Sequence, residues 1–124
     1  MTATVVERVG HTSVEDDMAL CVTALGAELT AYVAGAATVG ELESWFTAGR
    51  RPAPQVRRRL AAAAELVGVF EAANQSALAA GWLREVDPAG HVPARVLRLS
   101  DGDESSVKAL LEAAMTWAFT PAGE

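Results

Sequence analysis

Apolar residues recur along this chain at intervals of three and four, which is the spacing that places them on one face of an α-helix. Six helices are predicted on this basis, at 13–25, 27–34, 38–49, 54–73, 76–83 and 104–118. A short segment of two helical turns is predicted at 93–98. The longest helix carries a stripe that we expect to be buried, formed by Val56, Leu60, Ala63, Val67, Phe70 and Ala73. Residues 92–99 alternate weakly, but Pro93 and the short length argue against a strand. The pattern therefore predicts an all-α fold, a compact helical domain.

Residues with special backbone chemistry set the predicted helix ends. Gly26 and Gly35 follow the first two helices and can end them in the left-handed conformation. Thr38 and Glu41 have the spacing of a capping box at the start of the third helix. Pro54 fits the first position of the fourth helix, where its missing N–H costs nothing. Ser76 is expected to cap the fifth helix.

Charge is distributed unevenly along the chain. Its 124 residues include 16 acids and 10 bases, for a formal net charge of −6, which argues against general binding of polyanions. Residues 1–49 hold one base and seven acids, whereas residues 50–59 hold five bases and no acid. This basic segment, Arg50, Arg51, Arg57, Arg58 and Arg59, is the first indication of a function.

Several classes of protein are excluded or disfavoured. The single cysteine, Cys21, rules out an internal disulfide and predicts a cytoplasmic location, with the thiol buried as a small apolar group. No apolar run is long enough to span a membrane. His11 and His91 lack the spacing of metal ligands, and no phosphate-binding glycine loop occurs. We therefore predict no enzymatic activity, no metal and no cofactor.

The segment from Ala27 to Arg59 has the pattern of a helix-turn-helix. Two short helices flank a turn that contains Gly35, and Ala31 provides a small contact where the helices cross. Leu42 and Trp45 would anchor the second helix, whose outer face would lie in the major groove of DNA. The predicted base-proximal residues are Thr38, Gly40, Glu41, Ser44 and Thr47. The predicted phosphate-binding residues are Arg50, Arg51, Arg57 and Arg58.

Two segments carry a combination of residues in a distinctive order and spacing. The first is 25–35 together with Trp45, Gly49 and 50–54; the second is 82–88 followed by 93–98. Together they resemble the actinobacterial Xre/MbcA/ParS-type family of antitoxins and helix-turn-helix regulators. The resemblance covers residues 20–120. It implies an N-terminal helix-turn-helix that binds operator DNA, and a C-terminal helical region that binds a partner protein such as a cognate toxin. It also implies a homodimer that represses transcription.

The chain is accordingly divided into a flexible leader at 1–12, a DNA-binding region at 13–75 and a partner-binding region at 76–124. The predicted partner-binding residues are Trp82, Arg84, Arg95 and Arg98. An alternative function is a protein-interaction module that has lost DNA binding, acting as an antitoxin, an immunity factor or a phage-encoded inhibitor. Glu41 and Glu43, which would repel the phosphate backbone, favour this alternative.

Overall fold

The computed structural model describes residues 14–46, 52–85, 90–100 and 103–119, and these form helices without any strand. The predicted all-α fold is thereby confirmed. The elements in chain order are α2 (Val14–Leu25), α3 (Ala27–Ala34), α4 (Val39–Ser44), α5 (Pro54–Ala72), the 3-10 turn η1 (Ser76–Leu78), α6 (Ala79–Arg84), α7 (Pro93–Ser100) and α8 (Glu104–Ala118). The predicted leader at 1–12 lies outside the described residues.

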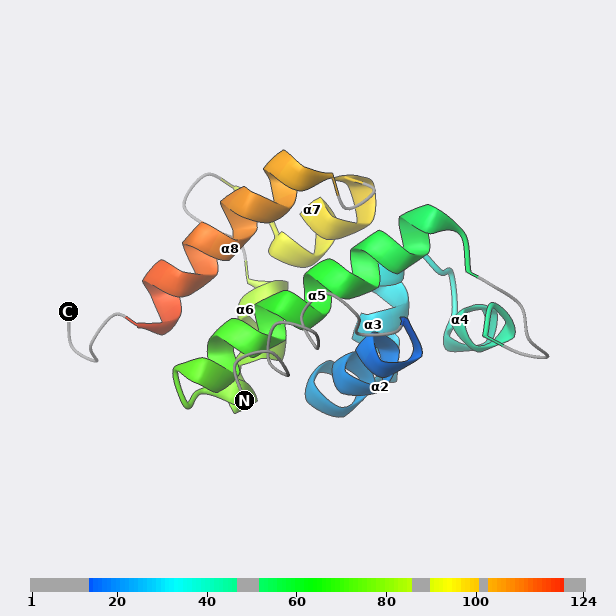
Figure 1. Cartoon of the computed structure of the whole chain (residues 1–124), viewed down its shortest axis with the longest axis horizontal. Coiled ribbons are helices and arrows are strands. Elements are labelled where there is room, and N and C mark those ends of the chain that lie inside the picture. The colour runs from blue at the N-terminus through cyan, green and yellow to red at the C-terminus, as the bar shows by residue number, and fades with distance from the viewer. Residues whose placement is uncertain (1–13, 47–51, 86–89, 101–102, 120–124) are drawn as a thin grey trace, which may run out of the picture.

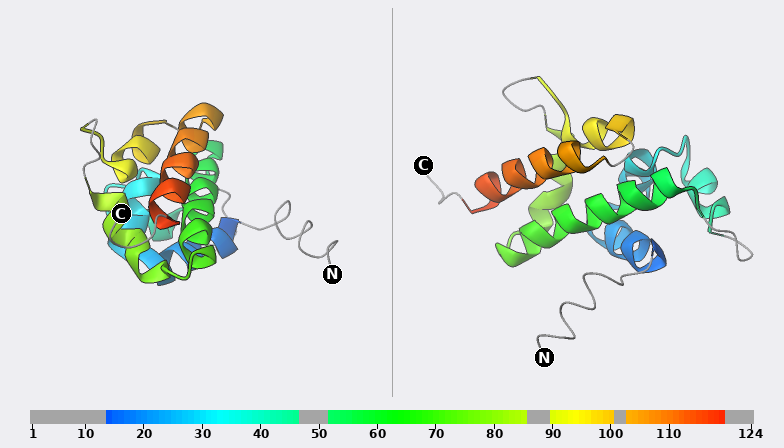
Figure 2. Two further views of the ribbon diagram at one scale, coloured as in Figure 1. Left: turned by 90° about the vertical axis from the view of Figure 1, so that its left-hand side faces the viewer. Right: turned by 45° about the horizontal axis from the view of Figure 1, so that its top comes forward.

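Helix α5 runs through the centre of the molecule. Helices α2 and α8 lie on opposite sides of it, and α4 lies near its N-terminal end (Figure 1). The same arrangement is visible after rotation (Figure 2). Five residues of the predicted stripe, from Val56 to Phe70, are buried, and Ala73 is half-buried. Because α5 is covered on more than one side, Ala62 and Leu66 are buried as well.

The glycine-terminated helices are confirmed. Gly35 has φ 95° and ψ 11°, the left-handed conformation that glycine adopts without a steric penalty. Gly26, between α2 and α3, has φ 92° and ψ 155°, an extended conformation with positive φ that is also accessible to glycine. The third helix is shorter than predicted, because α4 ends at Ser44 rather than near Gly49. At this point the Phe46 N–H donates to the carbonyl of Glu43, three residues back instead of four. This tighter, 3-10-type turn ends the α-helix.

The fifth helix also begins later than predicted. Ser76 does not cap it with its side chain but is the first residue of η1, and α6 begins at Ala79. The Leu78 N–H donates to the Gln75 carbonyl at 2.9 Å, so a 3-10 turn precedes the α-helix. Asp103 is the N-cap of α8. Its carboxylate accepts the Ser106 N–H at 3.0 Å, and this bond lowers the pKa of Asp103.

Two hydrophobic clusters stabilise the fold. The larger contains residues of α2, α3, α5, α6, α7 and α8. It therefore joins the predicted DNA-binding region, 13–75, to the predicted partner-binding region, 76–124. The smaller joins α3, α4 and the start of α5; its members are Ala31, Ala34, Ala36, Leu42, Val56 and Leu60. Cys21 is fully buried as predicted, and burial raises the pKa of its thiol to about 12. No described helix is long and apolar enough to cross a membrane.

Asp17 is a buried carboxyl group on α2, 8% exposed. Burial, and then the charges of Asp16 and Glu65, raise its pKa from 3.8 to about 6. The folded protein thus holds this proton more tightly than the unfolded chain does. The contribution of Asp17 to the free energy of unfolding therefore falls as the pH rises from about 4 to about 6.

We expect Asp17→Asn to remove this decline and to stabilise the protein at pH 7 by about 1 kcal/mol, a value reduced for solvent screening of the carboxylate. Urea unfolding at pH 4 and pH 7 measures the difference. Asp16→Asn is the matched control, since Asp16 is exposed on the same helix. A variant Asp17→Asn that gains no more stability at pH 7 than at pH 4 would contradict the assignment.

Candidate functional site

Helix α3, the turn at 35–38 and helix α4 form the predicted pair of short helices. Ala31 is 3% exposed and lies in the smaller cluster. Its burial fits the predicted role of a small residue where the two helices cross. Leu42 is buried in this cluster with Val56 and Leu60, and Trp45 packs against it half-buried. The predicted anchoring of α4 by Leu42 and Trp45 is therefore confirmed.

The start of α4 is held by a side-chain cap. The Glu41 N–H donates to Thr38 Oγ1 at 3.0 Å, which confirms Thr38 as the cap. The Glu41 carboxylate accepts the Ala37 N–H at 2.6 Å, one residue before the amide used in a standard capping box. Ser44 Oγ donates to the Glu41 carbonyl at 2.7 Å. The polar atoms at both ends of this short helix thus take part in bonds that stabilise it.

The outer face of α4 is exposed. It carries Gly40, Glu41, Glu43 and Ser44, all of which we predicted to lie there. Thr47, predicted to continue this face, lies outside the described residues. The outer face of α4 is acidic, because it carries Glu41 and Glu43 and the described residues of this helix include no Arg or Lys.

The three arginines in the first turns of α5 have different environments. Arg58 is exposed, whereas Arg57 is half-buried and its Nε is buried without a hydrogen-bond partner among the described residues. Arg59 turns toward α3 and donates from Nη1 to the Ala34 carbonyl at 3.0 Å. Arg50 and Arg51 lie outside the described residues. Of the predicted phosphate-binding residues that are described, Arg58 is the one with an exposed side chain.

A second arginine reaches the same end of α3. Arg98 of α7 donates from Nη1 to the carbonyls of Tyr32 at 2.8 Å and Ala36 at 3.0 Å. Its guanidinium lies over the Tyr32 ring, 4.8 Å from the ring centroid. We call Arg59 and Arg98 the arginine clamp, because together they bind three carbonyls at the end of α3 and in the turn before α4. The predicted partner residue Arg98 thus has an internal role that sequence reasoning missed.

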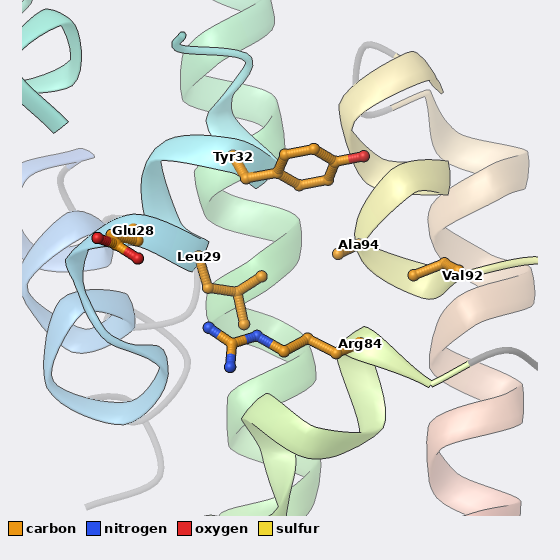
Figure 3. Close-up of a pocket in the computed structure, with 6 residues that line it drawn as sticks. All are labelled: Glu28, Leu29, Tyr32, Arg84, Val92 and Ala94. Atoms are coloured by element: carbon orange, nitrogen blue, oxygen red, sulfur yellow. The ribbon is translucent and has the colours of Figure 1, made fainter. Parts of the chain in front are cut away.

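The remaining predicted partner-binding residues are divided between core and surface. Trp82 is 8% exposed and packs against Phe70 with ring centroids 5.6 Å apart, so its predicted place on a partner-facing surface is not supported. Arg84 and Arg95 are exposed, on α6 and α7. Arg84 lines a surface groove with residues of α3 and α7, shown in Figure 3; the lining consists of Glu28, Leu29, Tyr32, Arg84, Val92 and Ala94.

Comparisons of the chain with models of known protein families, with curated proteins and with solved structures find no match. Among the described residues, no three His, Cys, Asp or Glu side chains are grouped so that they could hold a metal ion.

Proposed function

We propose that this chain is a helix-turn-helix regulator that binds operator DNA through the outer face of α4. The observation that carries the proposal is the anchoring of a short exposed helix, by Leu42 and Trp45, beside the basic first turns of α5. In a helix-turn-helix, the second helix enters the major groove while neighbouring positive charges contact phosphates.

The residues divide into two roles in this proposal. Those nearest the bases are Thr38, Gly40, Glu41, Ser44 and Thr47. Those that bind phosphates are Arg50, Arg51, Arg57 and Arg58. Arg58, exposed on α5, is the clearest of the described phosphate ligands. The bond from Ala37 to the Glu41 carboxylate means that Glu41 supports the helix start, and a base contact would have to share that oxygen or use the other one.

The proposal includes an antitoxin role in which two copies and a partner protein participate. A homodimer would present two α4 helices to half-sites about one DNA turn, ~34 Å, apart. A cognate toxin would bind the region after residue 76 and contact the exposed residues Arg84 and Arg95. These parts of the proposal derive from the family resemblance of segments 25–54 and 82–98.

A second function, a protein-interaction module without DNA binding, is favoured by the acidic outer face of α4. Glu41 and Glu43 are both exposed there, and carboxylates repel the phosphate backbone. In addition, Arg59 of the arginine clamp donates to the Ala34 carbonyl of α3. This bond leaves one base fewer in the basic segment 50–59 to contact phosphates.

Fluorescence anisotropy with DNA from upstream of the protein's own gene separates the two functions. We expect Arg58→Glu to weaken binding about tenfold and to lower the slope of log Kd against log salt by about 1. The double variant Arg50→Glu with Arg51→Glu should weaken binding further. The charge-matched control is Lys108→Glu, because Lys108 is exposed on α8, away from α4.

Two results would count against DNA binding at this face. If the unaltered protein fails to bind its upstream DNA at low salt, the interaction module becomes the better function. If Lys108→Glu weakens binding as much as Arg58→Glu does, overall charge rather than the α4–α5 surface controls affinity. Conversely, Glu43→Gln should strengthen binding, since it removes a negative charge from the outer face.

A further inference from the structure

The groove between α3, α6 and α7 has the size of a small-molecule site. Its volume is about 310 Å³, at the lower end of the range found for ligand pockets. It lies on the surface of the larger hydrophobic cluster, to which Leu29 and Ala94 belong. A small compound therefore fits this groove better than a nucleotide or a large cofactor does.

The floor of the groove is apolar and well supported. Leu29 and Ala94 are 6% and 2% exposed, and Val92 is half-buried beside them. Tyr32, 38% exposed, forms one wall. Arg98 holds this wall, because it binds the Tyr32 carbonyl and lies over its ring. Because the Tyr32 side chain is already held in place, ligand binding loses less of its conformational entropy.

Two opposite charges border this apolar floor. Figure 3 shows the Arg84 guanidinium extending from α6 past Leu29 toward α3, the helix that carries Glu28. Both side chains are exposed, and neither forms an ion pair or hydrogen bond with another described residue. The groove thus offers one cation and one anion, separated by a hydrophobic surface.

This arrangement limits the charge of the ligand. An uncharged apolar molecule would cover Arg84 and Glu28 without replacing their water, which costs free energy. A simple anion would pair with Arg84 and be repelled by Glu28, and a simple cation would meet the reverse situation. A zwitterion satisfies both groups, provided that it also has an apolar part for the floor.

We propose that this groove binds a free α-amino acid with an aliphatic side chain. Arg84 pairs with its carboxylate, a geometry for which the planar guanidinium is suited. Glu28 accepts hydrogen bonds from its ammonium group, and Leu29, Val92 and Ala94 contact its side chain. The site is distinct from the proposed DNA-binding face, and its occupancy does not depend on DNA binding.

The test uses L-leucine as the probe and two analogues that each lack one charge. We expect L-leucine to shift the amide NMR signals of Tyr32 and Ala94 with a Kd of about 1 mM, since both ion pairs are partly solvated. N-acetyl-L-leucine lacks the ammonium charge and L-leucinamide lacks the carboxylate. Each analogue should bind at least about tenfold more weakly, equivalent to losing one charge-assisted contact.

Substitutions of the two charged groove residues test the same proposal from the side of the protein. Arg84→Gln and Glu28→Gln should each weaken L-leucine binding about tenfold while leaving the rest of the spectrum unchanged, because both residues are exposed. Arg95→Gln is the control, since Arg95 is an exposed arginine of α7 that does not line the groove. Glu28→Gln should also improve binding of N-acetyl-L-leucine relative to L-leucine.

The proposal is overturned if L-leucine produces no saturable shift at ten times the expected Kd. It is also overturned if the two analogues bind as well as L-leucine does. Equal weakening by Arg95→Gln and Arg84→Gln would show that general charge, rather than this groove, accounts for binding. None of these outcomes bears on the DNA-binding experiment, so the two proposals can fail separately.

Discussion

Phe70→Ala should lower the free energy of unfolding by about 3–5 kcal/mol, the largest effect that we expect from a single substitution. Phe70 is fully buried on α5, and its ring lies 5.6 Å from the ring centroids of both Trp82 and Trp117. Truncation removes both aromatic contacts and leaves a cavity between α5, α6 and α8. Urea unfolding monitored by tryptophan fluorescence measures the loss.

Phe70→Leu is the appropriate control, because it keeps an apolar side chain of similar volume and removes only the aromatic contacts. We expect it to cost clearly less than Phe70→Ala. A loss below about 1 kcal/mol for Phe70→Ala would contradict the central packing position of this ring. The far-UV spectrum of each variant in water should remain helical if the protein is still folded.

Gly35→Ala should destabilise the protein by about 2 kcal/mol, combining backbone strain with a steric conflict. Gly35 has a φ of 95°, which an L-residue rarely adopts. A Cβ at this position would also collide with Arg59 Nη1, the atom that binds the Ala34 carbonyl. The substitution therefore disturbs the arginine clamp as well as the end of α3, and thermal or urea unfolding measures the sum.

Gly68→Ala is the matched control and should have the opposite sign. Gly68 lies within α5, and a Cβ built there has no atom within 4 Å that it could strike. Replacement by alanine raises helix propensity, so we expect a gain of about 0.5–1 kcal/mol. If Gly35→Ala were neutral, the left-handed end of α3 would not be the constraint described above.

Much of the fold can be predicted from sequence because its determinants are local. Gly26, Gly35 and Pro54 each act through their own backbone, so the helix ends at those positions follow from residue type alone. The stripe from Val56 to Phe70 likewise repeats within one helix. The cap at Thr38 requires only a neighbour three residues away.

Other features depend on contacts between distant parts of the chain. Met115 shares the helical spacing of Leu111 and Ala118 in α8, yet its side chain is 45% exposed. Trp82 could have lain on either a surface or a core position, and its contact with Phe70 decides for the core. The groove is formed by three helices, so the proximity of Glu28 and Arg84 has no signature in any single segment.

The arginine clamp shows the same limit most clearly. Arg59 is 25 residues from Ala34 along the chain, and Arg98 is 62 residues from Ala36. In the sequence these side chains belong to a basic segment and to a short amphipathic helix, and nothing nearby identifies their carbonyl partners. Long side chains can reach several acceptors, and only the packed helices determine which ones they bind.

The clamp also has an evolutionary consequence. Because Arg98 of α7 binds the turn that leads into α4, a substitution at position 98 changes the conditions under which substitutions at positions 32–41 are tolerated. These sites should therefore show epistasis, with the effect of one change depending on the residue at the other. A lineage that alters the sequence of α4 is freer to do so while Arg98 is kept. Exchange of the segment after residue 76 between homologues would therefore carry a stability cost at the turn before α4, far away in the sequence but in direct contact with Arg98.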